Sequence, residues 1–229
     1  MAEFPTAEEL ETLFREGKME RIGMGSRRAC YRIPETDLCV KCYRSDEEIE
    51  EGMYNGAQEL SPSVVREIKC SRFDEKRNTC CQEYRYWRKL RKRLPSKLFS
   101  VFPQTMECFF ISSRGWCIVQ ELVLNFDGTV PERFSRVYRA SSMYEKKQLL
   151  ADLKVFVSML IAYSVRLYDP QNITIQWISS LEFRLRVVDF EPVSRCLISI
   201  DMFCPPLVRA KTIRRVRRWM REHIGCEYE

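Results

Sequence analysis

Histidine, glycine and long apolar runs are scarce in this sequence. The 229 residues include one histidine, His223, and eight glycines. No apolar run approaches the roughly 20 residues that a membrane-spanning helix requires. A Cys-x-x-C motif occurs at residues 39–42, and the single histidine leaves no second set of ligands for a Cys/His zinc site. We therefore expect neither a membrane span nor structural zinc.

Cysteine, in contrast, is abundant. The count of 11 is odd, and most of these residues stand within apolar strand or helix patterns. The N-terminal segment is acidic: residues 6–14 have the pattern of a short capped helix and not that of a signal peptide. This combination favours free thiols packed as small hydrophobic groups in a reducing cytoplasm, where we expect the protein to be located.

Basic residues gather near the C-terminus. Residues 209–221 are helical by pattern, with Ile213, Val216 and Met220 along one face and arginines around the rest. Such an array is typical of a solvated helix face, or of weak, nonspecific binding to nucleic acid or an anionic surface. The formal net charge is only +6, because 32 acidic residues offset 38 lysines and arginines.

The N-terminal part predicts a hairpin followed by a third strand. Residues 20–33 have the pattern of a strand, a glycine-containing turn and a second strand, and residues 38–43 follow after another tight turn. In the third strand Lys41 alternates with the apolar Val40 and Cys42. Its side chain therefore points to the opposite face of the sheet from theirs.

Helices and a further hairpin are predicted after these strands. Residues 63–90 show helical periodicity, and residues 108–123 read as two strands joined by a turn. Residues 142–163 form a strongly amphipathic helix. Its first residue, Ser142, is followed by Glu145 three positions later, which is the pattern of a capping box.

Two short segments downstream of that helix carry polar groups at strand ends. Residues 168–173, Tyr-Asp-Pro-Gln-Asn-Ile, predict a Pro-x-Asn turn ahead of a strand. Residues 186–191, Arg-Val-Val-Asp-Phe-Glu, close a second strand. The pattern places the amide oxygen of Asn172 and the carboxylate of Asp189 at neighbouring strand ends.

The order of these segments resembles the protein-kinase-like superfamily, and within it the bacterial YrbL-like family of PhoP-regulatory-network proteins. The resemblance covers roughly residues 20–225. It is carried by Gly25 through Tyr31, by Val40-Lys41, by Glu83 with the aromatic helix that follows it, by Pro170-Gln171-Asn172-Ile173 and by Val188-Asp189.

The resemblance implies an ATP- and Mg²⁺-dependent phosphotransferase of unknown acceptor. In kinases a strand lysine reaches the α/β-phosphates and a helix glutamate orients it. Lys41 and Glu83 match these positions, with Glu67 and Glu75 as alternatives to Glu83. The other matched positions are Gly23 and Gly25 over the phosphates, Glu121 through Val123 at the adenine-binding hinge, Asn172 and Asp189 on the metal, and Asp169 near the acceptor.

Two departures from the kinase pattern leave alternatives open. Arg28 replaces the third glycine of the phosphate loop, and the charge of Arg27 or Arg28 could compensate for that loss. Leu167 stands where kinases carry the catalytic aspartate. The chain is therefore either an atypical kinase that uses Asp169 from a shifted position, or a pseudokinase or regulatory nucleotide-binding protein. A basic nucleic-acid-binding protein is a further alternative.

The expected fold is α+β, a compact two-lobed protein-kinase-like fold. An N-terminal helical extension, residues 1–19, precedes a small lobe, residues 20–124, with an antiparallel sheet and a helix. Residues 125–229 form a mainly helical lobe with the catalytic-loop-like and metal-binding segments.

Overall fold

The chain has a mixed α+β fold that divides into two compact units, each described by itself below. Unit 1 comprises Met1–Lys89 and Gln104–Leu122, and unit 2 comprises Leu90–Pro103 and Val123–Glu229. Segment 90–103, expected in the small lobe, thus groups with the second unit. The computed structural model describes residues 4–54, 60–92, 94–103, 105–163, 165, 167, 169–188 and 205–225.

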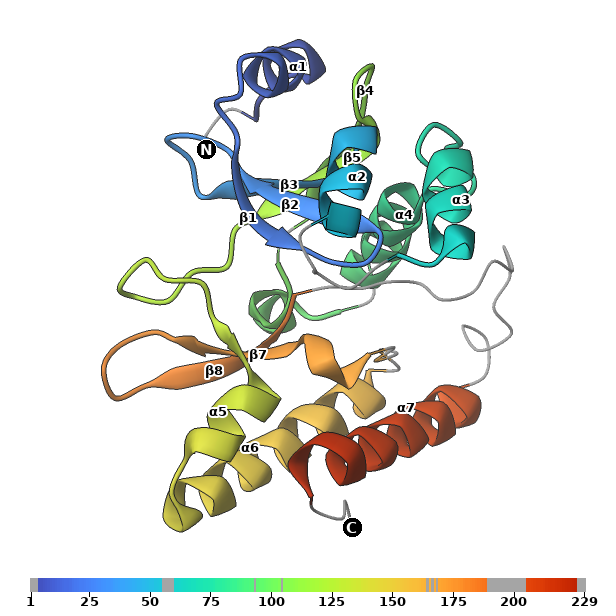
Figure 1. Ribbon diagram of the computed structural model, residues 1–229. Coiled ribbons are helices and arrows are strands. Elements are labelled where there is room, and N and C mark those ends of the chain that lie inside the picture. The colour runs from blue at the N-terminus through green and yellow to red at the C-terminus, as the bar shows by residue number, and fades with distance from the viewer. Residues whose placement is uncertain are drawn as a thin grey trace. The chain divides into compact units, whose positions relative to one another are not determined.

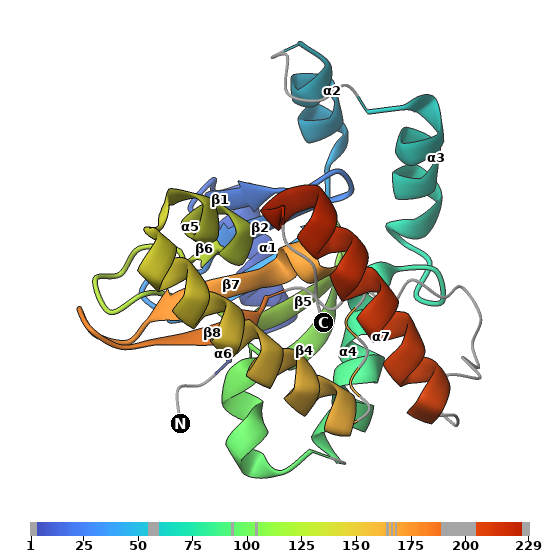
Figure 2. The ribbon, with the colours of Figure 1, turned by 90° about the horizontal axis from the view of Figure 1, so that it is seen from below.

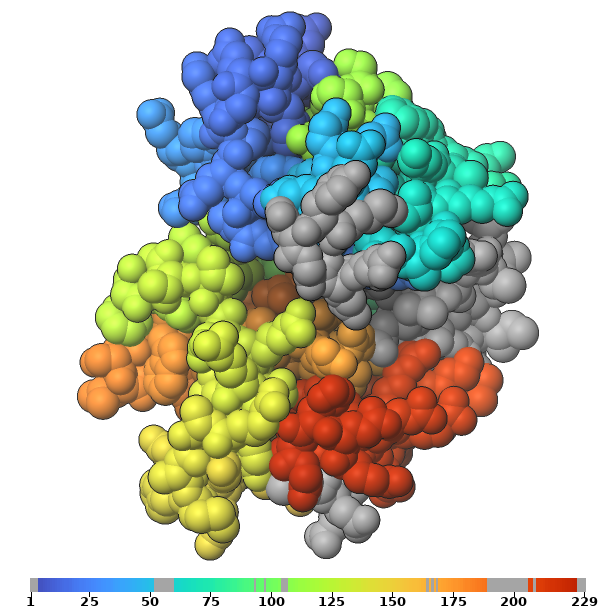
Figure 3. Space-filling view, viewed as in Figure 1, coloured from blue at the N-terminus to red at the C-terminus, as the bar shows by residue number. Residues whose placement is uncertain are grey.

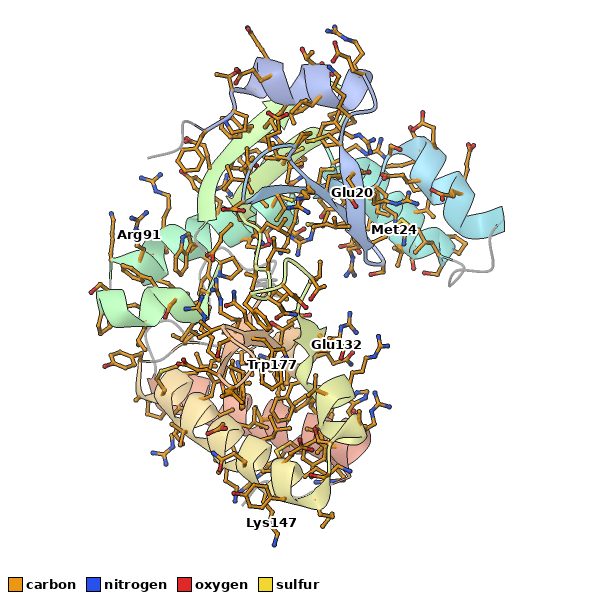
Figure 4. The ribbon with its side chains drawn as sticks, turned by 90° about the vertical axis from the view of Figure 1, so that its left-hand side faces the viewer. Glu20, Met24, Arg91, Glu132, Lys147 and Trp177 are labelled. Atoms are coloured by element: carbon orange, nitrogen blue, oxygen red, sulfur yellow. The ribbon has the colours of Figure 1, made fainter. Side chains whose placement is uncertain are left out.

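An antiparallel five-stranded sheet forms the centre of unit 1 (Figure 1). Its strand order is β1-β2-β3-β5-β4, and every neighbouring pair is antiparallel. The strands are β1 (Glu20–Met24, labelled at both ends in Figure 4), β2 (Arg28–Arg32), β3 (Leu38–Tyr43), β4 (Thr105–Ile111) and β5 (Gly115–Glu121). The predicted antiparallel sheet is confirmed.

One face of this sheet packs against the N-terminal helix α1 (Ala7–Arg15). Leu10 is fully buried there in a cluster that includes Val40 and Cys42 of β3. Thr6 caps the helix in a capping box with Glu9, as its sequence predicts. The first helix therefore contributes to the core of unit 1.

Helix α2 (Asp46–Tyr54) follows β3, and two further helices replace the single predicted helical stretch. These are α3 (Pro62–Ser71) and α4 (Thr79–Arg91). Asn78 separates them: its side-chain amide donates to the carbonyl of Arg72 at 3.0 Å, and its Oδ1 accepts the N–H of Cys80 at 2.8 Å. Asn78 thus satisfies backbone groups at the end of one helix and the start of the next.

Unit 2 combines helices with a three-stranded sheet of order β6-β7-β8. The sheet pairs Glu132 of β6 with Ile175 of β7, and Figure 4 labels Glu132 and Trp177 on these two strands. The elements are the 3₁₀ helix η1 (Ser96–Val101), β6 (Glu132–Arg133), α5 (Phe134–Ala140), α6 (Met143–Ala162), the 3₁₀ turn η2 (Pro170–Asn172), β7 (Ile173–Trp177), β8 (Phe183–Val187), α7 (Pro205–Trp219) and the π turn η4 (Met220–Ile224).

Helix α6 begins at the predicted capping box of Ser142 and Glu145. Its buried side chains include Leu153, Val157 and Leu160, and it contacts α7, which lies beside it in Figure 2. None of the helices among the described residues is both long enough and apolar enough to cross a bilayer.

A buried arginine explains why segment 90–103 belongs to unit 2. Arg186 of β8 is 1 % exposed, and its Nη2 donates to the carbonyl of Phe102 at 3.1 Å. Its Nη1 donates to Oε1 of Gln176 on β7 at 3.1 Å. The guanidinium therefore joins the end of η1 to the sheet of unit 2.

Candidate functional site

Lys41 lies on β3 in the middle of the sheet of unit 1. Its neighbours Val40 and Cys42 are completely buried, while the Lys41 side chain is 12 % exposed. Alternation along the strand therefore turns Lys41 away from the core cluster that holds its neighbours, as predicted.

Glu83 of α4 faces Lys41. The Glu83 carboxylate is fully buried, and its Oε1 lies 3.9 Å from Nζ of Lys41. The two alternatives have other cations: Glu67 lies 3.2 Å from Nε of Arg27, and Glu75 pairs with Arg85. Of the three candidate glutamates, the structure thus brings Glu83 to Lys41.

Arg28 is the residue whose position the sequence reasoning missed. Its Nη1 donates to Oε2 of Glu83 at 2.6 Å, and the Arg28 side chain is 6 % exposed. Arg28 therefore binds the carboxylate that also pairs with Lys41, and Arg27 is likewise held, by Glu67. Arg27 and Arg28, either of which could compensate for the missing glycine by its charge, are thus both paired with carboxylates.

The register of β2 against β3 is the feature from which the position of Arg28 could have been predicted. Cys30 of β2 stands opposite Lys41 of β3, and Arg28 precedes Cys30 by two residues. Residues two apart on a strand share a face. Arg28 and Lys41 therefore point to the same side of the sheet, the side on which α4 supplies Glu83.

A buried thiol completes this cluster. Cys80 of α4 donates to the carbonyl oxygen of Lys41 at 3.4 Å, and its Sγ lies 4.0 Å from Nη1 of Arg28. Burial raises the pKa of the Cys80 thiol from 9.0 to about 12, so the thiol is neutral at physiological pH. The cluster of Arg28, Lys41, Glu83 and Cys80 thus holds two cations and one carboxylate in a largely dry environment.

The glycine-containing turn between β1 and β2 is held by backbone and side-chain bonds. Gly25 donates to the carbonyl of Arg28 at 2.8 Å, and Nε of Arg44 donates to the carbonyl of Gly25 at 2.9 Å. Neither Gly23 nor Gly25 has a positive φ. Their backbone conformation therefore does not require glycine, and what they provide is the absence of a side chain.

The two predicted hinge residues fall in different units. Glu121 ends β5 and pairs with Leu38 of β3, and the following N–H, of Leu122, donates to the carbonyl of Asp37 at 2.9 Å. Val123 is buried and begins the long segment of unit 2.

The Pro-x-Asn segment of unit 2 forms the 3₁₀ turn η2. Asp169 is exposed, and its Oδ1 accepts the N–H of Gln171 at 2.9 Å, which caps the turn. The carbonyl of Asn172 accepts the N–H of Val188 at 3.2 Å. Asn172 therefore lies beside the end of β8, and Asp189 lies outside the described residues.

The described residues do not by themselves make a metal site. Among them no group of three or more His, Cys, Asp or Glu side chains could hold a metal ion. Mg²⁺ binds oxygen ligands in octahedral geometry. Asn172 supplies one amide oxygen, and the Asp169 carboxylate is bonded to its own turn. Leu167 is buried and apolar, and it offers no ligand atom.

Comparison with known proteins places the chain in a family. The model of the family described as PhoP regulatory network protein YrbL matches residues 17–223. The chain belongs to this family. The match spans both units and so includes Arg28, Lys41 and Glu83 as well as η2. No curated protein matches the chain.

Proposed function

We propose that this member of the family is an atypical protein-kinase-like phosphotransferase, with ATP as the phosphate donor and an acceptor still to be identified. The observation that carries the proposal is the ion pair between Lys41 of β3 and Glu83 of α4. A lysine on the third strand of an antiparallel sheet, oriented by a helix glutamate, is the arrangement with which kinases bind the α/β-phosphates.

The charges around this pair support anion binding. Arg28 and Lys41 bring two cations to the same side of the sheet, next to the carboxylate of Glu83. Of the two cations, Lys41 is the more exposed. A phosphate group that reaches Lys41 would meet a preorganised ammonium in a low-dielectric surrounding, where its attraction exceeds that in water.

The proposal extends to the kinase-like two-lobed fold and its remaining positions. The turn at Gly23 and Gly25 would cover the phosphates, and Glu121 and Val123 would border the adenine. Magnesium, when bound, neutralises charge on the phosphates. Asn172 and Asp189 are the proposed ligands. A cytoplasmic location is part of the proposal, and the free state of the eight described cysteines agrees with it.

A pseudokinase is the second candidate, and one observation favours it. Leu167 is buried and cannot accept a proton from an acceptor hydroxyl. The carboxylate of Asp169, the proposed substitute, accepts a backbone N–H of its own turn. In a pseudokinase the Lys41 site would bind nucleotide without transfer.

Phosphotransfer from radiolabelled ATP distinguishes the two candidates. We expect the native protein to release labelled phosphate or to label itself, and Lys41→Met and Asp189→Asn to reduce that rate to background. Lys18→Met is the matched control, since Lys18 is an exposed lysine of unit 1 that pairs only with Glu16 among the described carboxylates. Nucleotide binding without transfer in the native protein would select the pseudokinase, and absence of both would reject the nucleotide site.

A further inference from the structure

Helix α7 and the turn η4 border a hollow of about 520 Å³. Small-molecule sites have volumes of about 300–1,000 Å³. The helix lies at the surface in the space-filling view, where it is red (Figure 3). The described lining consists mainly of Arg214, Arg217, Arg218 and Arg221, with Ile213 and Glu222.

The opposite face of α7 is anchored in the core of unit 2. Val216, Trp219 and Met220 are buried, and the Trp219 ring lies 5.9 Å from that of Phe134 on α5. The helix therefore has a fixed rotation about its axis. Its arginines are held on the outer face, next to the hollow.

Three of these arginines have no carboxylate partner within the part of the chain that the structure describes. Arg214, Arg218 and Arg221 are exposed and form no ion pair there. Arginines of unit 1 behave differently, because many are paired: Arg21 with Glu51, Arg27 with Glu67, Arg28 with Glu83, Arg72 with Asp46, Arg77 with Asp74, Arg85 with Glu75 and Arg114 with Glu48.

Repulsion between neighbouring arginines destabilises the helix itself. Arg214 and Arg218 are four residues apart, which places like charges next to each other on one face. Glu222 is the one acidic residue of α7 and η4. A helix that keeps several neighbouring arginines beside a hollow would be stabilised by an anion from outside the chain.

We infer that the arginine face of α7, defined by Arg214, Arg217, Arg218 and Arg221, binds a compact molecule that carries two or more phosphate groups. Guanidinium groups match phosphate oxygens in bidentate geometry and stay charged at all physiological pH values. Residues 214–221 cover about 10 Å of helix, which suits several phosphates on one small scaffold. This inference does not rest on the proposed nucleotide site at Lys41.

Two larger partners fit the observations less well. Single-stranded nucleic acid is held by aromatic side chains between basic ones, and the described lining of the hollow has no aromatic residue. Insertion into a membrane surface needs a free apolar face, whereas Val216, Trp219 and Met220 are buried in the protein.

Calorimetric titration with inorganic tripolyphosphate tests the inference. We expect saturable binding to the native chain, and at least about ten-fold weaker binding to Arg214→Gln with Arg218→Gln, because two charge-assisted contacts are lost. Glutamine is also a good helix former. The control is Lys147→Gln with Lys154→Gln, which removes equal charge from exposed positions on α6 (Lys147 in Figure 4) and should change affinity less than two-fold. The native and variant arginine faces are compared in the Lys41→Met background, which removes binding of the probe at the proposed nucleotide site.

The melting temperature supplies a second readout that needs no ligand. At low salt the Arg214→Gln, Arg218→Gln variant should melt slightly above the native protein, because like-charge repulsion is removed. Tripolyphosphate should raise the melting temperature of the native protein and of the lysine control more than that of this variant. Equal loss of affinity in the two double variants would overturn the inference in favour of nonspecific charge. So would binding of a mixed-sequence oligonucleotide without binding of tripolyphosphate.

Discussion

Nη1 of Arg28 lies 2.6 Å from Oε2 of Glu83, closer than Nζ of Lys41, which lies 3.9 Å from the other carboxylate oxygen. The glutamate that orients the proposed phosphate-binding lysine is thus fixed first by an arginine from the neighbouring strand. Because the Glu83 carboxylate is held by Arg28 of β2, it cannot move freely with the Lys41 side chain. Its position is set by the strand that carries Arg28.

Glu83→Gln should destabilise the folded protein by about 3–5 kcal/mol, because it leaves two largely buried cations without their shared carboxylate. Glu67→Gln is the matched control. It removes a carboxylate from the Arg27 pair, whose side chains are 33 % and 24 % exposed, and should cost at most about 1 kcal/mol. Urea unfolding of both variants measures the difference, and equal costs would show that Glu83 is not the centre of a buried cluster.

Gly115→Ala should destabilise unit 1 by at least about 2 kcal/mol. Gly115 has a φ of +74°, and an added Cβ would meet the carbonyl group of Arg72, its carbon at 2.8 Å. Gly23→Ala is the control, because φ is not positive there and nothing lies within 4 Å of the new atom. It should leave stability unchanged or raise it by up to about 1 kcal/mol. A tolerated Gly115→Ala would contradict the described turn between β4 and β5.

Because of Cys80, we expect the free energy of unfolding to decrease in alkaline solution. Its folded pKa of about 12 lies above the ordinary 9.0, so between these values the unfolded thiol ionises while the folded thiol keeps its proton. The free energy of unfolding should therefore fall by up to about 1.4 kcal/mol per pH unit for this group as the pH rises through that window. Cys80→Ala should flatten the slope in urea titrations at several pH values. An unchanged slope would mean that the thiol is not buried.

Asp169→Asn should preserve the structure of unit 2 and remove the proposed chemical role of the carboxylate. Asparagine keeps a side-chain oxygen that can accept the N–H of Gln171, so the cap and the stability should persist. If the proposed transferase role holds, turnover falls by about 10²–10⁴-fold, because the charge that orients and deprotonates the acceptor is lost. Single-turnover rates with native and variant protein decide this. Activity within a few-fold of native would limit Asp169 to its capping role.

Local signals predicted much of the fold. The capping boxes at Thr6 and Ser142 mark the true starts of two helices, and alternation placed Lys41 on the correct face of β3. These features depend on residues close in sequence. The break between α3 and α4 escaped prediction because Asn78 makes it by bonding two helix ends at once, which periodicity does not reveal.

The site depends on contacts between residues that are far apart in the sequence, and this limited its prediction. The choice of Glu83 over Glu67 and Glu75 depends on how α3 and α4 pack on the sheet, which the sequence leaves open. The inward position of Arg28 depends on the register of β2 against β3. Segment 90–103 joins unit 2 through the contact of Arg186 with Phe102, two residues far apart in the sequence.

The central claim is that Lys41 and Glu83 form a nucleotide site, and equilibrium binding of a non-hydrolysable MgATP analogue tests it most directly. The native protein should bind the analogue saturably by calorimetry, and at 100 times the dissociation constant the ligand should add about 2.7 kcal/mol to the free energy of unfolding. Lys41→Met should weaken binding at least about ten-fold, while Lys18→Met should bind as the native protein does. Absence of binding to the native chain at millimolar analogue, or equal binding by Lys41→Met, would contradict the account.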